Sequence, residues 1–236
     1  MRIGITERGD AALDFSWKDY SGYKILITKD PKKLIDKSKA VDFKKAIIHC
    51  TITGLGKTIL EPNVPKPEVS LEAYKKFVDY LGPERVVLRV DPLWPEIDFY
   101  LENQIPVIEQ NISRVRISFL DMYPKVMARL DAINWPKSTA YYYDNKWNIH
   151  SKLEFRQNEL EFIKKIKTDV EVCGEPGLEC TGCISMRDVY ALGISPDKIS
   201  GKLCNQRMAC HCLAEKFELL SNKTQCYHGC IYCYWS

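Results

Sequence analysis

The sequence predicts an α/β fold: a parallel sheet that forms a partial or complete (β/α) barrel, followed by a cysteine-rich C-terminal extension. Short runs of β-branched and apolar residues alternate with helical patterns through residues 1–173. The chain has 236 residues, 45% of them hydrophobic, which is enough to bury a sizeable core. Of its ten cysteines, all except Cys50 lie at or after residue 173. We therefore expect a barrel over residues 1–173 and a cysteine-rich tail over 174–236, packed on the mouth of the barrel.

The first half of the chain predicts three strands and two helices. Strands are expected at 2–6 (RIGIT) and 23–28 (YKILIT), where β-branched residues dominate. A proline that can open a helix then predicts a helix over about 31–39, and 46–53 (AIIHCTIT) is the next strand. Apolar residues at helical spacing predict a helix over 70–81, with Ser70 as the N-cap and a Gly-Pro stop directly after it.

The second half continues the alternation to a total of six or seven strands. Helices are expected over 97–110, despite an internal proline, and over 154–166. Strand–helix alternation at this pitch is typical of a parallel sheet. The remaining expected strands are 85–90, 115–120, 139–143 and 168–172.

Charge and composition exclude some classes of protein. The 34 basic and 31 acidic side chains are interspersed and give a net charge of +3, which argues neither for nor against nucleic-acid binding. The N-terminus has no apolar run long enough for a signal peptide, and no stretch approaches a membrane span. We expect a cytoplasmic protein without a membrane partner, in which reduced cysteines act as metal ligands or redox groups.

The last residues contain the sequence CYHGCIYC, in which Cys226, Cys230 and Cys233 have the spacing C-x3-C-x2-C. We call these three residues the terminal cysteine motif. Three closely spaced thiolates suit three irons of a [4Fe–4S] cluster and leave the fourth iron open to another molecule. Zinc is the alternative, because His228 could supply a fourth ligand. Wrapping all four residues of one short loop around a single ion is awkward, so we favour the iron–sulfur cluster.

Polar residues stand at the carboxyl ends of several expected strands, where barrels place their active sites. These strand-end segments contain Lys29, Thr51, Thr53, Arg89, Asp91, Ser118, Asp121 and Glu175. Arg89 lies between two valines, and Asp91 points to the same face of the strand. The pair has two readings of equal weight: a buried ion pair, or a guanidinium that binds a carboxylate or phosphate in a pocket.

An ordered set of short segments gives the chain a resemblance to a known family. The set is 27–31 (ITKDP), 51–56 (TITGLG), 61–65 (EPNVP), 89–92 (RVDP), 117–121 (ISFLD) with Tyr123, and 226–233. It resembles the family called domain of unknown function 1848, in the radical S-adenosylmethionine (SAM) superfamily and similar to spore photoproduct lyases. The family's N-terminal stretch is matched only by Arg8 and Asp10, and a Gly-Gly-Glu element that many relatives use to hold the SAM amino group is missing.

The resemblance implies a TIM-like barrel whose C-terminal loop binds a [4Fe–4S] cluster. SAM would chelate the open iron, and one electron would cleave SAM to a 5′-deoxyadenosyl radical that abstracts a substrate hydrogen. On this reading the catalytic candidates are Lys29, Arg89, Asp91 and Tyr123. Tyr232 would pack against the adenine or seal the barrel mouth, and Glu175 or Asp121 would replace the missing glutamate. The remaining cofactor-binding candidates are Thr51, Thr53 and Ser118.

Six further cysteines lie between the last expected strand and the terminal cysteine motif. The resemblance fits Cys173, Cys183, Cys210 and Cys212 best as ligands of a second [4Fe–4S] cluster, and zinc is the alternative there. Cys180 and Cys204 have no assigned role, and Cys50 is expected to be an ordinary core residue. Tyr123 and Cys173 are also candidate hydrogen donors.

Two classes of function therefore compete. The first is a radical SAM enzyme that acts on a nucleic-acid base, a small metabolite or a peptide. Its partners would be SAM and an electron donor such as ferredoxin or flavodoxin. The second is a non-catalytic iron–sulfur or zinc module for electron transfer or partner docking.

Overall fold

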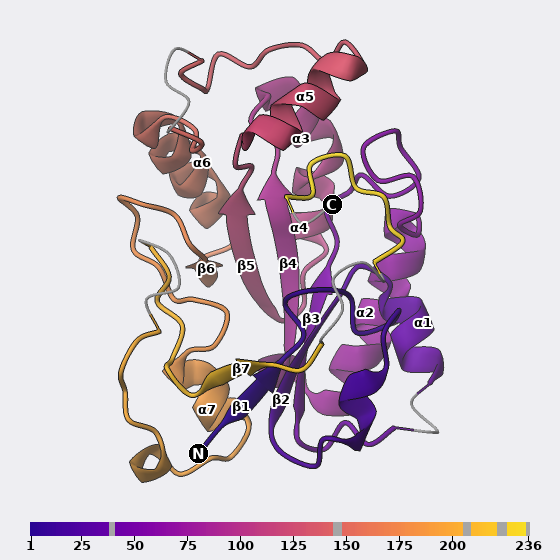
Figure 1. Cartoon of the computed structure of the whole chain (residues 1–236), viewed down its shortest axis with the longest axis vertical. Coiled ribbons are helices and arrows are strands. Elements are labelled where there is room, and N and C mark those ends of the chain that lie inside the picture. The colour runs from indigo at the N-terminus through magenta and orange to yellow at the C-terminus, as the bar shows by residue number, and fades with distance from the viewer. Residues whose placement is uncertain (38–40, 144–147, 205–208, 221–225, 235–236) are drawn as a thin grey trace.

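The structure is a computed structural model that describes residues 1–37, 41–143, 148–204, 209–220 and 226–234. Its centre is a seven-stranded sheet of order β6-β5-β4-β3-β2-β1-β7, in which every neighbouring pair is parallel. The sheet is open, because β6 and β7 lie at its two edges, and it curls like half of a barrel (Figure 1). The predicted α/β fold with a partial barrel is confirmed.

Most strands are buried throughout, as expected for a parallel sheet covered on both faces. The five central strands lie within two residues of their expected starts, whereas the short β7 was not expected. The strands are β1 (Ile3–Ile5), β2 (Lys24–Thr28), β3 (Ala46–Thr51), β4 (Val86–Leu93), β5 (Arg114–Phe119), β6 (Val170–Val172) and β7 (Lys216–Glu218).

Helices cover the outer face of the sheet and bury the larger apolar core with it. Those that contribute to this core are α1 (Pro31–Asp36), α2 (Pro67–Leu81), α3 (Ile97–Asn103), α4 (Ile105–Glu109) and α6 (Leu153–Ile166). The helix α5 (Pro124–Ala132) packs in a separate apolar cluster, and α7 (Met186–Ala191) packs on the inner face. Three 3-10 turns complete the set: η1 (Ser16–Asp19), η2 (Pro83–Arg85) and η3 (Pro196–Lys198). Among the described residues, no helix has the length and apolarity to cross a membrane.

Three of the expected elements differ from the structure. The helix expected at 70–81 begins at Pro67, because proline suits the first helical position, and Ser70 lies inside the helix. The helix expected over 97–110 is divided at Gln104, just before Pro106. The helix expected over 31–39 ends at Asp36, and residues 38–40 lie outside the described residues.

The strand expected at 139–143 is wrong. The place beside β5 is taken by β6, and this segment forms turns instead. Tyr141 anchors it by donating its hydroxyl hydrogen to the carbonyl oxygen of Leu120. Ala140 and Tyr141 pack in a separate apolar cluster, whereas Tyr142 and Tyr143 are exposed.

The inner face of the sheet changes from apolar to polar along the strands. Along β3 the inward side chains are Ile47, His49 and Thr51, because alternate residues of a strand share a face. The apolar inner residues pack against Ile184 and Val189 from the cysteine-rich segment, which we define as residues 174–215. This segment therefore fills the part of the half barrel that lies away from the carboxyl ends of the strands. A polar region is left at those carboxyl ends.

Four buried charged residues fasten the cysteine-rich segment to the sheet. Arg114 and Arg116 of β5 lie 2.8 and 2.6 Å from Glu171 of β6. They also lie 2.8 and 3.6 Å from Asp188 of α7. All four side chains are at most 6% exposed, so the charges neutralise one another away from water.

Candidate functional site

A cavity of about 500 Å³ lies at the carboxyl ends of the strands, where the sequence predicted the site. It is lined by strand ends, by the loop after β1, by the first residues of the cysteine-rich segment and by the terminal cysteine motif. Most of the predicted site residues line it: Lys29, Thr51, Arg89, Asp91, Ser118, Asp121, Cys173, Glu175, Cys183, Cys226, Cys230, Tyr232 and Cys233. The structure thus brings together side chains from five strands and from the far end of the chain.

Four predicted site residues do not line this cavity. The hydroxyl oxygen of Thr53 accepts a hydrogen bond from the backbone N–H of Leu55. The ring of Tyr123 lies 5.4 Å from that of Tyr234, which does line the cavity. Cys210 and Cys212 lie deeper, among the thiols of the cysteine-rich segment.

The terminal cysteine motif is held against the loop between β3 and α2. The side-chain amide of Asn63 donates to the carbonyl oxygen of Tyr227 at 2.9 Å, and Ile231 N–H donates to the carbonyl oxygen of Leu60 at 3.0 Å. The chain turns at Gly229, whose φ of +67° suits glycine. These contacts place all three cysteines of the motif at the cavity although they come last in the sequence. The C-terminal segment lies near the carboxyl ends of the central strands (Figure 1).

Lys29, Glu61 and Tyr232 form a buried cluster beside Cys230. The Lys29 Nζ atom lies 2.8 Å from both Glu61 Oε1 and the Tyr232 hydroxyl oxygen, and Tyr232 also donates to Glu61. Burial lowers the pKa of Lys29, but Glu61 and the thiolate form of Cys230 raise it by more. The pKa of Lys29 therefore lies above its usual value. Lys29 is therefore a fixed positive charge at the wall of the cavity. Glu61 had no role in the sequence prediction, although its segment was part of the family resemblance.

Asp10 and His228 form a second pair that ties the terminal cysteine motif to the loop after β1. His228 Nε2 lies 2.7 Å from Asp10 Oδ2, which also accepts the Lys29 N–H at 2.6 Å. Burial would raise the pKa of Asp10, but its hydrogen bonds with His228, Lys29 and Thr28 hold it below the usual value. Asp10 therefore stays ionised and orients the imidazole of His228.

Arg89 and Asp91 are both an ion pair and part of the cavity wall, so the two readings of the sequence are compatible. Arg89 Nη2 contacts Asp91 Oδ2, and the other oxygen of Asp91 accepts from the Ser118 hydroxyl at 2.5 Å. Arg89 Nε is buried, and among the described residues it has no hydrogen-bond partner. Burial opposes the charge, but Asp91, Cys183 and Cys173 raise the pKa of Arg89. Its guanidinium is thus a permanent cation with one unused donor.

Asp121 and Glu175 supply two further carboxylates to the lining of the cavity. Asp121 Oδ1 lies 2.7 Å from His150 Nδ1. Glu175 accepts the Phe119 N–H at 2.7 Å and pairs with Arg156 at 3.1 Å. Burial raises the pKa of Glu175 to about 7, although the Phe119 N–H and Arg156 favour its ionised form. Either residue could therefore meet a cationic ligand group, and Glu175 could also exchange a proton near neutral pH.

Burial favours the protonated thiols of Cys226 and Cys230 in the terminal cysteine motif when no metal binds them. Burial raises the pKa of Cys226, and it raises that of Cys230 to about 12 despite the nearby charge of Lys29. A thiolate here needs a metal cation to compensate for its loss of water. The site therefore favours a metal-bound state over a free nucleophilic thiolate.

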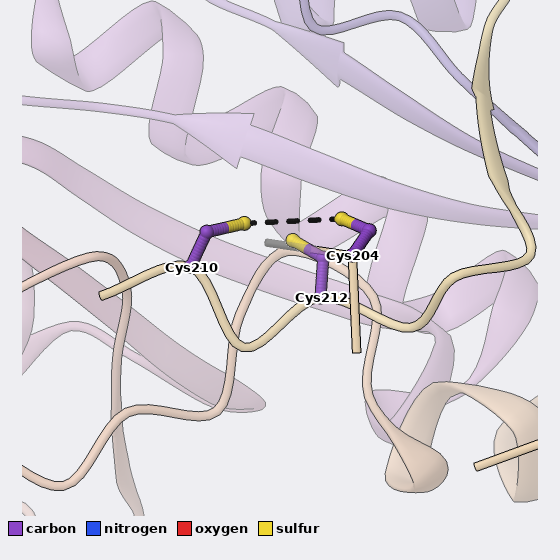
Figure 2. Close-up of side chains that lie close together, drawn as sticks. All are labelled: Cys204, Cys210 and Cys212. Atoms are coloured by element: carbon purple, nitrogen blue, oxygen red, sulfur yellow. Dashed lines mark hydrogen bonds between the residues drawn. The ribbon is translucent and has the colours of Figure 1, made fainter. Parts of the chain in front are cut away.

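A second set of thiols begins at the cavity wall with Cys173 and Cys183 and continues into the cysteine-rich segment. The Cys173 and Cys183 sulfurs are 3.2 Å apart, and Cys183 N–H donates to Cys212 Sγ at 3.1 Å. The ligand atoms of Cys204, Cys210 and Cys212, which we call the cysteine trio, all lie within 4.8 Å of one another (Figure 2). The trio could hold a metal ion. Cys204 was unassigned in the sequence prediction, because the family resemblance fitted four other cysteines best.

The comparisons with known proteins agree with the family resemblance. A family model described as "Domain of unknown function (DUF1848)" matches residues 17–235. The match includes every strand except β1 and both sets of cysteines. No curated protein and no solved structure matched the chain significantly.

Proposed function

The chain belongs to the family described as domain of unknown function DUF1848, and from this premise we propose that it is a radical SAM enzyme. The observation that carries the proposal is the meeting of three cysteines of C-x3-C-x2-C spacing with a cavity of about 500 Å³ that is also lined by charged side chains. Cavities of about 300–1,000 Å³ are typical of small-molecule sites. A non-catalytic metal module would not need such a cavity beside its ligands.

The residues of the terminal cysteine motif fit an iron–sulfur cluster better than a single zinc ion. Within the part of the chain that the structure describes, the cysteine trio is the only group of three ligand atoms found within 4.8 Å of one another. The terminal thiols are thus more widely spaced, and they do not converge with His228 on one point. His228 is instead paired with Asp10. Three spread thiolates suit a cluster in which each binds a different iron.

When bound, the cluster would supply the electron and the open iron needed for reductive cleavage of SAM. The chain's own residues would position the cofactor. Lys29 and Arg89 are the cations that could bind the SAM carboxylate, and the carboxylate of Asp121 or Glu175 could bind its amino group. Thr51 and Ser118 add hydroxyl groups to the lining of the cavity.

Aromatic side chains would help to shield this chemistry from water. Tyr232 packs edge-on against Trp94 with 6.0 Å between ring centroids, and its hydroxyl is fixed by Glu61. Tyr234 lines the cavity and rests on Tyr123. On this proposal Tyr123 supports the rim, and Cys173, which does line the cavity, is the better placed of the two candidate hydrogen donors.

Formation of 5′-deoxyadenosine tests the proposal. Protein reconstituted anaerobically with iron and sulfide should convert SAM to 5′-deoxyadenosine and methionine when dithionite is added. Cys230→Ala should lose this activity together with its iron. Cys50→Ala should keep both, because Cys50 lies in the core on the outer face of the sheet. If wild-type protein with a full cluster forms no more 5′-deoxyadenosine than Cys230→Ala, the proposal is wrong.

The substrate and the surroundings of the enzyme are further parts of the proposal. The reaction requires an electron donor such as ferredoxin or flavodoxin and a reducing compartment such as the cytoplasm. A nucleic-acid base is one candidate substrate, and it would have to leave its stack to reach the cavity. Binding to single-stranded and duplex DNA, measured over a range of salt concentrations, tests this candidate, since binding without a salt dependence would exclude it.

A further inference from the structure

We propose that the cysteine trio, completed by Cys183, binds a single zinc ion. The sequence left zinc and a second [4Fe–4S] cluster open for the inner cysteines, and it grouped Cys173 rather than Cys204 with them. The geometry points to a different ligand set and to a mononuclear metal. This inference does not depend on the proposed function, because it concerns none of the residues of the terminal cysteine motif.

The spacing of the trio is that of ligands to one ion. Cys204 Sγ and Cys210 Sγ lie 4.0 Å apart, and Cys212 Sγ completes a group with no distance above 4.8 Å. Tetrahedral zinc with Zn–S bonds of about 2.3 Å requires sulfur–sulfur distances of about 3.8 Å. The three side chains point toward one another (Figure 2), Cys204 from one arm of the chain and Cys210 and Cys212 from the other. A small inward adjustment would bring all three sulfurs onto one zinc ion.

The same distances argue against a second cubane cluster. In a cubane each thiolate binds a different iron, so the cysteine sulfurs lie farther apart than the sulfurs of the trio do. Cys173 and Cys183 are closer still, at 3.2 Å, and could not serve two irons of one cluster without moving apart. Cys173 is therefore better described as a thiol that hydrogen-bonds to Cys183 than as a metal ligand.

Cys183 is the fourth ligand because its loop is pressed against the trio. Its backbone N–H donates to Cys212 Sγ at 3.1 Å, a contact that supports a metal-bound thiolate. The neighbouring Gly182 has a φ of +75°, and a Cβ atom there would lie 2.6 Å from the backbone nitrogen of Cys212. Only glycine permits this approach of the two segments. The close approach places Cys183 beside Cys212 of the trio, from where its thiol would complete the ligand set.

The surrounding chain is organised as a support for such a site. The backbone N–H of Cys204 donates to the carbonyl oxygen of Cys212 at 2.7 Å, which pairs the two arms that carry the trio. Four thiolates on Zn²⁺ leave a net charge of about −2. Cations stand on two sides of it: Lys216 Nζ lies 3.8 Å from Cys212 Sγ, and Arg116 donates to the carbonyl oxygen of Cys183 at 3.0 Å. The ion would thus fasten the cysteine-rich segment under the cavity.

Metal analysis of matched variants tests the inference. The probe is Zn²⁺, measured by elemental analysis after expression with zinc and iron present, and Co²⁺ substitution reports the ligands through its visible spectrum. Wild-type protein should hold about one zinc per chain with tetrathiolate cobalt absorption. Cys204→Ser and Cys183→Ser should each lose most of the zinc or bind it at least tenfold more weakly. Cys173→Ser is the control and should keep about one zinc.

A variant without the terminal cysteine motif separates this inference from the proposed function. Cys226→Ala/Cys230→Ala/Cys233→Ala should lose its iron and still bind one zinc ion. The inference is overturned if wild-type protein binds about eight irons and no zinc. It is equally overturned if Cys173→Ser loses the metal while Cys204→Ser retains it, since that result would restore the ligand set expected from the sequence.

Discussion

The buried ion pair between Lys29 and Glu61 shows how single residues connect the fold to the site. The side chain of Lys29 is 17% exposed and that of Glu61 only 1%, so neither charge is well solvated by water. Together they fix the hydroxyl of Tyr232 and thereby the last residues of the chain. Removing one charge leaves the other buried without compensation.

Glu61→Gln should therefore destabilise the protein by about 3 kcal/mol. The measurement is the free energy of unfolding from urea denaturation. Glu72→Gln is the matched control, because Glu72 pairs with Lys76 on the exposed face of α2 and should leave the unfolding free energy unchanged. An equally small effect of Glu61→Gln would mean that the pair does not hold the terminal residues in place.

His49 gives the protein a pH dependence that can be measured. Burial, with the positive charges of Arg116, Arg89 and Arg114, lowers the pKa of His49 well below 6.5. The folded protein keeps His49 neutral, whereas the unfolded chain takes up a proton below about pH 6.5. The stability contributed by the neutral form is therefore present above pH 6.5 and is lost as the pH falls.

The unfolding free energy of wild type relative to His49→Gln should consequently fall by up to about 1.4 kcal/mol per pH unit below pH 6.5. Urea denaturation of both proteins between pH 7.5 and about pH 5 measures this difference. Above pH 7 the difference should be constant. A difference that stayed flat down to pH 5 would show that His49 takes up its proton in the folded protein as readily as in the unfolded chain.

At the scale of elements, the loop between β3 and α2 determines where the terminal cysteine motif lies. The loop starts at Gly54, whose φ is +80° and whose added Cβ would lie 2.0 Å from the carbonyl oxygen of Asn103 at the end of α3. Gln104 fixes the same region through hydrogen bonds to the carbonyl oxygens of Thr53 and Pro92, both at 3.0 Å. The loop then carries Glu61 and Asn63 to the motif.

Gly54→Ala should destabilise the protein by roughly 3 kcal/mol or more, because it adds a clash with fixed backbone to an unfavourable φ. Gly193→Ala is the control: its φ of +66° is equally unfavourable, but open space surrounds the added Cβ. It should cost only about 1 kcal/mol. Thermal and urea unfolding of both variants test this difference, and similar losses would show that the clash is relieved by movement of α3.

The elements that could be predicted from sequence are those with a strong local signal. The central strands are rich in Val, Ile and Leu, and α2 combines helical spacing with a Gly-Pro stop. The segment 139–143 has the aromatic and small residues of an edge strand, but the place beside β5 is taken by β6. β7 has only three half-buried residues, and its pairing with β1 depends on a contact more than 200 residues away in the chain.

At the scale of the whole molecule, the parallel sheet explains which parts of the site could be foreseen. Arg89, Asp91 and Ser118 stand at strand ends, and strand ends of a parallel sheet meet at one edge whatever the connections are. Asp10, Glu61 and Cys204 lie in loops, whose course is set by distant packing and not by local pattern. The terminal cysteine motif was recognisable by its spacing, but only the fold shows that it lies beside the strand ends.

Closure of the inner face of the half barrel depends on the four buried charges that join β5, β6 and α7. Asp188 is fully buried and neutralises part of the charge of Arg114 and Arg116. It also caps α7 by accepting the Ser185 N–H at 2.7 Å. Asp188→Asn removes the charge but not the shape, so it should destabilise the protein by about 3–5 kcal/mol.

Arg187→Met is the matched control on the same helix. Arg187 is a third exposed and pairs with Glu84 and Asp169 at the surface, so its loss should cost no more than about 1 kcal/mol. Because α7 holds the cysteine-rich segment to the inner face, Asp188→Asn should also speed limited proteolysis within residues 174–215 under native conditions, whereas Arg187→Met should not. Equal proteolysis rates for wild type and Asp188→Asn, despite a loss of global stability, would show that the apolar contacts of Ile184 and Val189 alone keep the half barrel closed.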